Sequence, residues 1–411
     1  MTTLPFFCNS LFNDTTIEFD TVRKAMLIVE QLDDRPIEGV EVRDARSATA
    51  TELELVHDPA YVAAVRDGDP WDLAESNGIG WDEGLFAAVC ASTGGVRDAV
   101  LWAWRNQRHA GAGSSGLHHA KYDRGDGFCT FNGLVVAARA ALADGAERVL
   151  IVDLDAHCGG GTASLIEHVD GIEQIDVSVS SFDWYAGRTD ARLWYTDGSN
   201  YLNVVREALA TVESPETVDV VLYNAGVDVH ELAGGVRNIT AEVVRDRERL
   251  VFEWANRYGL PVAFVFAGGY SGFGLELDDV IGLHTLTIEA ARDAQAAIEV
   301  PRQRYRPVAN GWAVPVVPAE RRGGSGTTSP ATRSASSSSS LNRYNAMAWA
   351  YNASASVRWP PVLATQARYS SASAWKAGSR ARSSRSSAVC AASCVARRVL
   401  RAWNTAARAR W

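Results

Sequence analysis

Four clusters of residues with chemically useful side chains follow apolar runs or lie in glycine-rich loops. They are His118-His119, Asp153-x-Asp155-x-His157, Asp228 within 223–230, and Gly268-Gly269-Tyr270. Three of the four have ordinary structural explanations when taken singly, because histidine pairs occur on surfaces, aspartates cap helices and Gly-Gly-Tyr can form a turn. The Asp-x-Asp-x-His cluster is more specific, since it follows the uncharged run Val149–Val152 directly. Charge at the end of a buried strand needs a partner, and a divalent metal ion is a good one.

The elements that must position these clusters are read from apolar periodicity. Uncharged β-branched and aliphatic runs predict strands at 149–154, 175–179, 218–223 and 262–266. Helical spacing predicts helices at 19–32, 51–66, 83–105, 131–143, 201–212, 241–258 and 283–298. Strands that alternate with helices indicate βαβ units. We therefore expect an α/β protein with three αβα layers and a mainly parallel central sheet.

In such a sheet the carboxyl ends of neighbouring strands open on one crevice, so the clusters near residues 155, 228 and 270 can meet there. Two carboxylates and one histidine make an oxygen and nitrogen metal site with a fourth position open, which is the layout of catalytic zinc. Two further histidines beside it can serve as general base and general acid. A tyrosine hydroxyl can donate a hydrogen bond to a developing oxyanion.

The ordered motifs resemble those of the histone deacetylase superfamily, which includes bacterial acetoin-utilisation proteins and acetylpolyamine amidohydrolases. The matching stretches are HDPAYVAAVR at 57–66, GLHHA at 116–120, GFCTFN at 127–132, VLIVDLDAHCGGGT at 149–162, NAGVDVH at 224–230 and AGGYSG at 267–272. The resemblance extends over nearly all of residues 1–298. The resemblance implies the arginase/deacetylase fold, one Zn²⁺ per chain, and hydrolysis of an N-acyl amide.

The resemblance also implies metal ligands. It assigns the zinc ion to Asp155, His157 and Asp228. Members of the superfamily commonly hold a potassium ion near the same strand end. Its expected contacts here are Asp153, Asp155, His157 and Ser178.

The resemblance further implies catalytic and substrate-binding residues. His118 and His119 handle the proton, one mainly as base and the other mainly as acid. Asp153 hydrogen-bonds His118 and sets its tautomer. Tyr270 polarises the substrate carbonyl, and Phe128 lines a tunnel for an acyl-lysine-like chain. The residues assigned to substrate binding are Gly127, Phe128 and Gly269.

Several positions depart from the superfamily pattern. Cys158 and Ser180 stand where many relatives have histidine, and residues 230–235 read HELAGG. Gly160 stands where relatives carry the Asp or Asn that supports the second tandem histidine. We therefore expect His119 to lack its usual partner, within an otherwise intact site of a divergent bacterial type.

Two functions from different classes follow. The first is zinc-dependent deacetylation of acetyl-lysine, an acetylpolyamine or a related small acylated amine. The second is a catalytically weak, zinc-containing protein that binds acylated amines, which the missing partner of His119 favours. An arginase, which shares the fold, ranks low because Gly159–Gly161 supply no ligands for a second metal ion.

Composition divides the chain of 411 residues in two. Residues 1–300 hold 48 Asp and Glu against 22 Lys and Arg, whereas residues 301–411 hold 18 Lys and Arg and one acid, Glu320. We expect a catalytic domain over 1–298 and a low-complexity basic tail over 299–411. Three interpretations of the tail stay open: a disordered segment, a segment that binds nucleic acid or a membrane surface, or the frame-shifted translation of a GC-rich gene. The acidic body suits cationic substrates, but we favour ordinary solubility as its explanation.

The remaining expectations concern location and partners. The N-terminus lacks the basic start and apolar core of a signal peptide, and no uncharged run approaches the about 20 residues that span a bilayer. We expect a cytoplasmic protein with no membrane or nucleic-acid partner for the catalytic domain. The six scattered cysteines indicate no disulfide framework. The sequence carries no signal for an oligomeric state.

Overall fold

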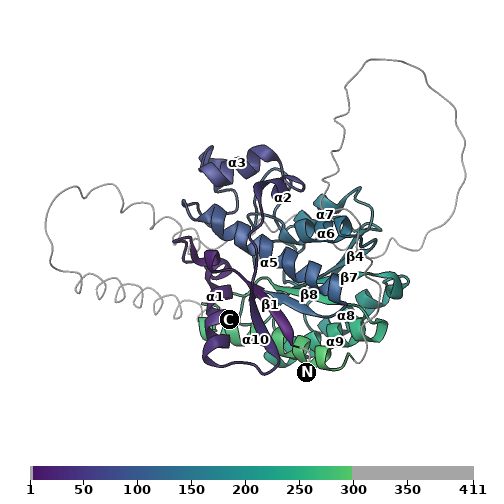
Figure 1. Ribbon diagram of the computed structural model, residues 1–411. Helices are drawn as coiled ribbons and strands as arrows, with labels where there is room; N and C mark the ends of the chain where they lie inside the picture. The colour runs from purple at the N-terminus through teal and green to yellow at the C-terminus, as the bar shows by residue number, and fades with distance from the viewer. Residues whose placement is uncertain (1–2, 299–411) are drawn as a thin grey trace, which may run out of the picture. The chain divides into compact units, whose positions relative to one another are not determined.

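The computed structural model describes residues 3–298 of the chain. Within them the strands form one eight-stranded sheet in the order β2-β1-β3-β8-β7-β4-β5-β6, and every neighbouring pair is parallel (Figure 1). The strands are β1 (Leu4–Cys8), β2 (Val40–Asp44), β3 (Ala110–Ala112), β4 (Val149–Asp153), β5 (Ile172–Ser178), β6 (Ala191–Tyr195), β7 (Val220–Ala225) and β8 (Val262–Phe266). The predicted α/β class is confirmed, and the sheet is parallel throughout.

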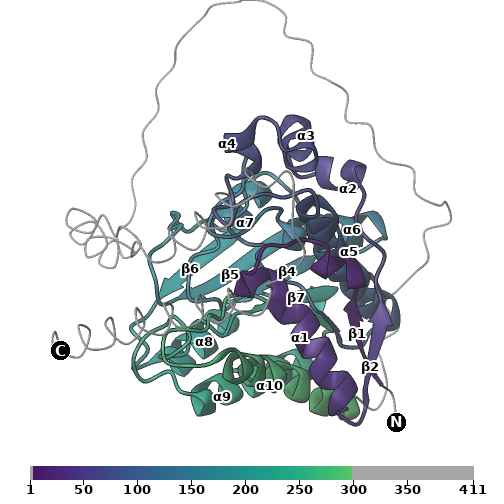
Figure 2. The same ribbon diagram turned by 90° about the vertical axis from the view of Figure 1, so that its left-hand side faces the viewer.

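Helices cover both faces of this sheet. They are α1 (Asp20–Asp34), α2 (Ala50–Glu54), α3 (Pro59–Asp67), α4 (Trp71–Ala74), α5 (Leu85–Asn106), α6 (Gly133–Ala143), α7 (Gly160–Ile166), α8 (Tyr201–Ala210), α9 (Ala241–Tyr258) and α10 (Leu277–Ala296). Short 3₁₀ helices lie at Ser10–Asn13 and Pro215–Thr217. Figure 2 shows α8, α9 and α10 together on one side of the sheet, and α5, α6 and α7 on the other.

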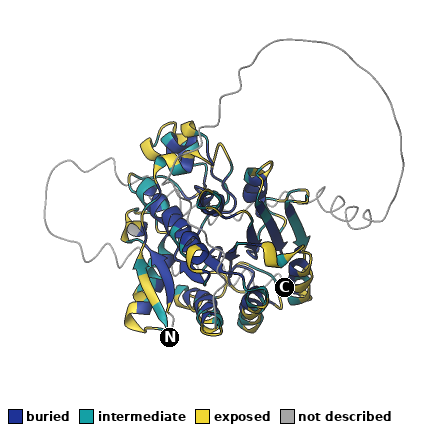
Figure 3. Cartoon of the chain, turned by 45° about the vertical axis from the view of Figure 1, so that its right-hand side comes forward, coloured by how far each residue is buried: buried dark blue, intermediate teal, exposed yellow. Residues whose placement is uncertain are grey.

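The pleat of β4 explains the three layers. Leu150 and Val152 pack into the hydrophobic cluster that contains residues of α1, α8, α9 and α10. Val149 and Ile151 point the other way, into the cluster formed with α3, α5 and α6. All four side chains are fully buried. A central parallel strand therefore has to be apolar on both faces, and Figure 3 shows the inner strands buried while exposed residues lie on the outer sides of the helices.

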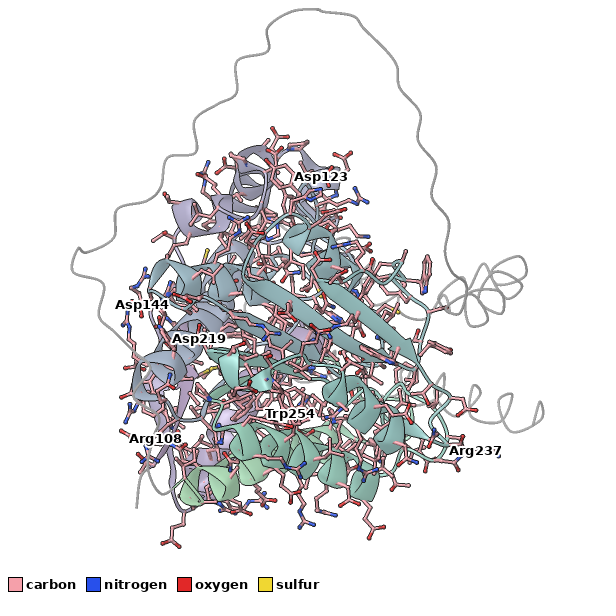
Figure 4. All side chains as sticks on the ribbon, turned by 90° about the vertical axis from the view of Figure 1, so that its right-hand side faces the viewer. Arg108, Asp123, Asp144, Asp219, Arg237 and Trp254 are labelled. Carbon is pink, nitrogen blue, oxygen red and sulfur yellow. The ribbon has the colours of Figure 1, made fainter. Side chains whose placement is uncertain are left out.

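The two ends of the sheet differ chemically. Near the amino-terminal ends of β4 and β7, the half-buried Asp219 accepts backbone hydrogen bonds from Glu147 (2.7 Å) and Arg148 (3.0 Å). Figure 4 places Asp219 on one side of the molecule and Arg237, from the loop that follows β7, on the opposite side. The strands thus run from an exposed polar end toward the end that carries the motif residues.

The four strands predicted from sequence all exist, with small shifts at their ends. The prediction missed β1, β2, β3 and β6. In β1, Pro5 weakens the strand pattern; it lies outside the part of β1 that pairs with β3. The strand β3 has three residues, and β2 and β6 are edge strands that are only half-buried. Such short or partly exposed strands lack the apolar run that identifies a central strand.

The helical stretch predicted at 51–66 is present and consists of two helices. The first, α2, begins at the capping box of Thr49 and Glu52. The second, α3, begins at Asp58, whose side chain accepts a hydrogen bond from Ala60 N, and has Pro59 in its first turn. Proline cannot continue a helix without breaking its hydrogen bonds, so Asp58-Pro59 starts a new one.

None of the helices within residues 3–298 combines the length and apolar character needed to cross a bilayer. The four cysteines in this part of the chain are free and buried, consistent with the absence of a disulfide framework. The predicted basic tail at 299–411 lies outside the described residues.

The pair Gly94-Gly95 lets α5 approach another backbone segment closely. A Cβ atom on Gly94 would lie 2.0 Å from Arg46 O, whereas one on Gly95 would have its nearest neighbour, Phe7 O, at 3.7 Å. We therefore expect Gly94→Ala to destabilise the protein by about 1–3 kcal/mol, since the overpacked helix must shift. Gly95→Ala is the matched control; it should be neutral or stabilise by up to about 1 kcal/mol. Urea unfolding measures both, and equal free energies for the two variants would contradict the close approach.

Candidate metal centre and active site

Three ligand-type side chains converge at the carboxyl ends of β4 and β7. Asp155, His157 and Asp228 each offer one atom to a common centre, and these atoms lie within 4.8 Å of one another. Both carboxylates are buried, and the His157 side chain is 14% exposed. The opening at His157 leaves the centre accessible from one side.

The separations between these atoms match those of metal ligands. His157 Nδ1 lies 3.2 Å from Asp155 Oδ1 and 3.1 Å from Asp228 Oδ2. Ligands held at zinc distances and tetrahedral angles are about 3.3 Å apart. In addition, Asp228 Oδ2 is buried, and His157 Nδ1 is the polar group that it faces. A cation between these atoms would satisfy it, so the residues present fit a divalent metal ion.

Backbone hydrogen bonds aim the remaining carboxylate oxygens. Asp155 Oδ2 accepts from Gly268 N at 2.7 Å, and Asp228 Oδ1 accepts from Ala156 N at 3.0 Å. A Cβ atom on Gly268 would lie 2.0 Å from Asp228 Oδ2 and 2.6 Å from Asp155 Oδ2. Only glycine therefore allows the backbone just after β8 to contact both carboxylates. This contact closes the side of the site that faces β8.

The first tandem histidine faces this centre. His118 Nδ1 donates to Asp153 Oδ2 at 2.8 Å, as the sequence predicted for this pair, and His118 Nε2 lies 3.5 Å from Asp155 Oδ1. Asp153 is itself held by Asn224 Nδ2 at 2.9 Å. Since a carboxylate oxygen is the acceptor in this pair, Nδ1 of His118 carries a proton and Nε2 points to the centre.

The second tandem histidine has a carboxylate partner, so the expectation that His119 lacks one is wrong. His119 Nδ1 donates to Asp183 Oδ2 at 3.0 Å. Asp183 comes from the loop that follows β5, 64 residues away along the chain. The superfamily pattern places this partner at residue 160, which is glycine here. Asp183 follows Phe182 in a loop of ordinary composition, and no local pattern marks it.

Burial and charge shift the pKa values of these histidines in opposite directions. Burial disfavours the charged form of each ring, but the carboxylates of Asp153 and Asp155 raise the pKa of His118 to about 10. Burial and the neighbouring His118 lower the pKa of His119 to about 4. Against the same burial, Asp155 and Asp228 raise the pKa of His157 to about 10. Two carboxylates that hold a proton on His157 form a strong field for a cation.

Aromatic rings form the walls above the centre. The rings of Phe128 and Tyr270 lie 6.1 Å apart between centroids. Phe182, which the sequence analysis missed, stands edge-on to His119 at 4.9 Å and to His157 at 5.9 Å. A Cβ atom on Gly127 would lie 2.4 Å from the His119 ring, so this glycine has to approach the histidine closely.

Tyr270 lies beside the centre at the end of β8. Its backbone N–H donates to Ala233 O at 3.1 Å. Burial, with Asp228 and Asp155 adding to it, raises the pKa of Tyr270 well above its usual value, against a hydrogen bond with Thr21. The hydroxyl therefore keeps its proton and can donate it to a hydrogen bond. The neighbouring Gly269 has φ +151°, which disfavours any side chain there.

Two buried cations that the sequence analysis missed support these loops. Lys24 of α1 is fully buried, donates to Ala267 O, and has its Nζ 5.6 Å from the Tyr270 ring centroid. Arg247 of α9 donates to Leu154 O at 3.0 Å and Gly226 O at 2.6 Å. Arg247 thereby joins the loops that carry Asp155 and Asp228. Both lie in amphipathic helices, where sequence alone does not tell a buried cation from an exposed one.

The predicted potassium contact Ser178 lies at the end of β5, where its hydroxyl donates to Asp176 Oδ1 at 3.0 Å. Asp176 also accepts from Gly159 N at 2.7 Å. Burial and the facing Asp153 raise the pKa of Asp176 well above its usual value. A proton on Asp176 thus reduces the charge at this edge of the sheet.

A family model for the histone deacetylase domain matches residues 19–277. The chain is 33% identical over 272 residues to an uncharacterised protein of Picosynechococcus sp., which covers 64% of this chain and 88% of the relative. It is 28% identical over 253 residues to the acetoin utilization protein AcuC of Bacillus subtilis, covering 55% of this chain and 65% of that one. This chain belongs to the histone deacetylase family.

Solved structures agree at the level of the fold. The HDA15 HD domain superposes with a TM-score of 0.59 at 19% identity, over 72% of this chain and 90% of that one. The acetylpolyamine aminohydrolase of Burkholderia pseudomallei gives a TM-score of 0.57 at 17% identity, over 70% and 98%. The predicted arginase/deacetylase fold is confirmed.

The centre makes a direct prediction about metal binding. Asp228→Asn should reduce bound divalent metal from about one per chain to background, since it removes one of two charged ligands. Asp176→Asn is the matched control, because it mimics a protonated carboxyl at the same sheet edge and should retain the metal. Elemental analysis after dialysis measures both. A full complement of metal in the Asp228 variant would contradict the assignment.

Proposed function

We propose that this protein is a zinc-dependent deacetylase that hydrolyses the N-acyl bond of a small or peptidyl acylated amine. Its membership of the histone deacetylase family supports hydrolytic deacetylation in general. The observation that carries the proposal is the convergence of His118 and His119 on the three-ligand centre of Asp155, His157 and Asp228. A protein that only binds its ligand has no need of two oriented proton carriers.

In this proposal the ligands Asp155, His157 and Asp228 hold the metal ion. Zinc, when bound, acts as a Lewis acid that lowers the pKa of water and polarises a carbonyl. The charge of its ligands and the buried Asp228 oxygen support this assignment. A potassium ion with Asp153, Asp155, His157 and Ser178 stays a prediction.

The chain's own residues move the proton. The neutral His119 takes a proton from the attacking water, and a protonated histidine of the pair returns one to the departing amine nitrogen. The opposite pKa shifts of His118 and His119 support this division of tasks. Asp153 and Asp183 keep the two rings oriented while the proton moves.

The remaining residues bind the substrate. The Tyr270 hydroxyl donates a hydrogen bond to the carbonyl oxygen as negative charge develops on it. Phe128 and Phe182 flank the acyl-bearing chain and exclude water from it. Gly127 brings the backbone against the His119 ring, and Gly269 brings it against Val227, so a substrate-binding role for these two glycines stays a prediction. The names of relatives, which include a polyamine deacetylase of Homo sapiens, support acylated amines as the substrate class.

The alternative was a catalytically weak protein that binds acylated amines. It depended on the absence of a partner for His119. Since Asp183 supplies that partner at 3.0 Å, the structure removes the observation that favoured it. We therefore propose the hydrolase as the function.

The proposal is tested by turnover of acetyl-lysine peptides and acetylpolyamines with the zinc-loaded protein. We expect release of acetate, loss of turnover on treatment with a chelator, and recovery on addition of Zn²⁺. His119→Ala should keep its zinc and lower kcat by about 100- to 10,000-fold, because it removes a general base. Binding of these ligands with no acetate release, or turnover that survives complete zinc removal, would reject the proposal.

A further inference from the structure

We propose that Asp183 is the positioning residue of His119, and that it replaces the carboxylate or amide that residue 160 does not supply. By accepting from Nδ1, Asp183 keeps the His119 proton there and leaves Nε2 free to act on the substrate side. This inference rests on the proposed function for its kinetic consequence. The tautomer of His119 follows from the geometry alone.

Asp183 occupies the space beside Gly160. A Cβ atom there would lie 2.2 Å from Asp183 O and 2.6 Å from Asp183 Oδ1. The loop after β5 thus fills the volume that a side chain at residue 160 would occupy. Gly160 has no positive φ that would itself demand glycine. The close approach of Asp183 therefore explains the glycine at residue 160. Asp183 supplies the carboxylate that residue 160 does not.

Both oxygens of the Asp183 carboxylate are held by neighbouring groups. Oδ2 accepts from Gly161 N at 2.9 Å as well as from His119. Oδ1 lies 3.1 Å from Lys121 Nζ, which also pairs with Asp126 at 2.9 Å. The Asp183 side chain is only 6% exposed. A buried, ion-paired carboxylate with these donors is rigid enough to orient a ring.

The backbone conformation of Asp183 also favours an orienting role. Asp183 has φ 56°, in the left-handed region that an L residue seldom adopts. Aspartate tolerates that region better than most residues, but the conformation still has a cost. Here it turns the carboxylate inward, while the adjacent Phe182 ring packs on His119. The loop is anchored by the hydrogen bond from Cys158 N to Phe182 O at 3.1 Å.

One consequence concerns how the site is built. The carboxylate that orients His118 comes from the rigid strand β4, whereas the one that orients His119 comes from a loop that also supplies the aromatic wall Phe182. Any displacement of this loop therefore changes the substrate wall and the orientation of His119 together.

The kinetic test compares Asp183→Ala with Asp183→Asn in the zinc-loaded full chain. We expect Asp183→Ala to lower kcat by about 10- to 100-fold with KM changed less than about threefold. Asp183→Asn should recover most of the loss, because its amide oxygen can still accept from Nδ1. The matched control is Asp190→Ala, which removes an aspartate of the same loop that pairs with Arg188 and not with His119. It should leave kcat unchanged.

A second variant tests the same idea without removing a polar group. Gly160→Ala should push Asp183 away from His119 and lower kcat as Asp183→Ala does, with zinc content close to wild type and a melting temperature that still leaves the protein folded at the assay temperature. Equal kcat for wild type, Gly160→Ala and Asp183→Ala would overturn the proposal. A loss of kcat in Asp190→Ala as large as in Asp183→Ala would also overturn it, since the loop and not the carboxylate would then matter.

The tautomer gives a readout that does not need turnover. In ¹⁵N NMR of the zinc-loaded protein, His119 should carry its proton on Nδ1 in wild type and Asp183→Asn, and a mixture should form in Asp183→Ala. A proton on Nε2 in wild type would overturn the positioning role. If no acylated amine is hydrolysed but the tautomer is as expected, the proposed function fails while the role of Asp183 stands.

Discussion

The burial of several carboxylates at one edge of a parallel sheet is the constraint on which the rest of this structure depends. Asp153, Asp155, Asp176 and Asp228 are at most 1% exposed. Asp153 and Asp176 even face each other across neighbouring strands. Charges removed from water at such density require compensation, and the surrounding structure supplies it as protons, backbone N–H groups, histidines and room for a cation.

Each form of compensation has its own structural origin. The raised pKa of Asp176 favours its neutral form, whereas Asp153 faces His118. Asp155 accepts backbone N–H groups on both oxygens, from Gly268 and His157, and Asp228 accepts one on Oδ1. Asp155 Oδ1 and Asp228 Oδ2 face His157 Nδ1, in an arrangement that would hold a metal ion. The chemistry of the site thus follows from the same electrostatic demand that shapes its fold.

Close backbone approach makes this compensation possible. Gly226 and Gly268 bring the ends of β7 and β8 against Asp155, where any Cβ atom would come within about 2.6 Å of it. Behind them, the buried Arg247 joins the carbonyl groups of Leu154 and Gly226. Side-chain donors alone could not reach the carboxylates from these directions, because the strands on both sides leave no space for them.

The sequence alone determined the central strands, the fold class and the metal-binding motif. These features are local: an uncharged run marks a buried strand, and the strand rule places its end at a shared crevice. Short or half-exposed strands such as β3 and β6 carried too weak a pattern. The positions of Asp155, His157 and Asp228 at one centre were therefore predictable from two separate segments.

Only the tertiary structure decided how the site is supported. The contacts of Asp183 with His119, Lys24 with Ala267, and Arg247 with Leu154 join residues 64, 243 and 93 positions apart. No local pattern encodes them, because each depends on which loops the packed sheet brings together. The sequence showed that Gly160 lacks a side chain, and it took the fold to show that Asp183 fills the same space from another loop.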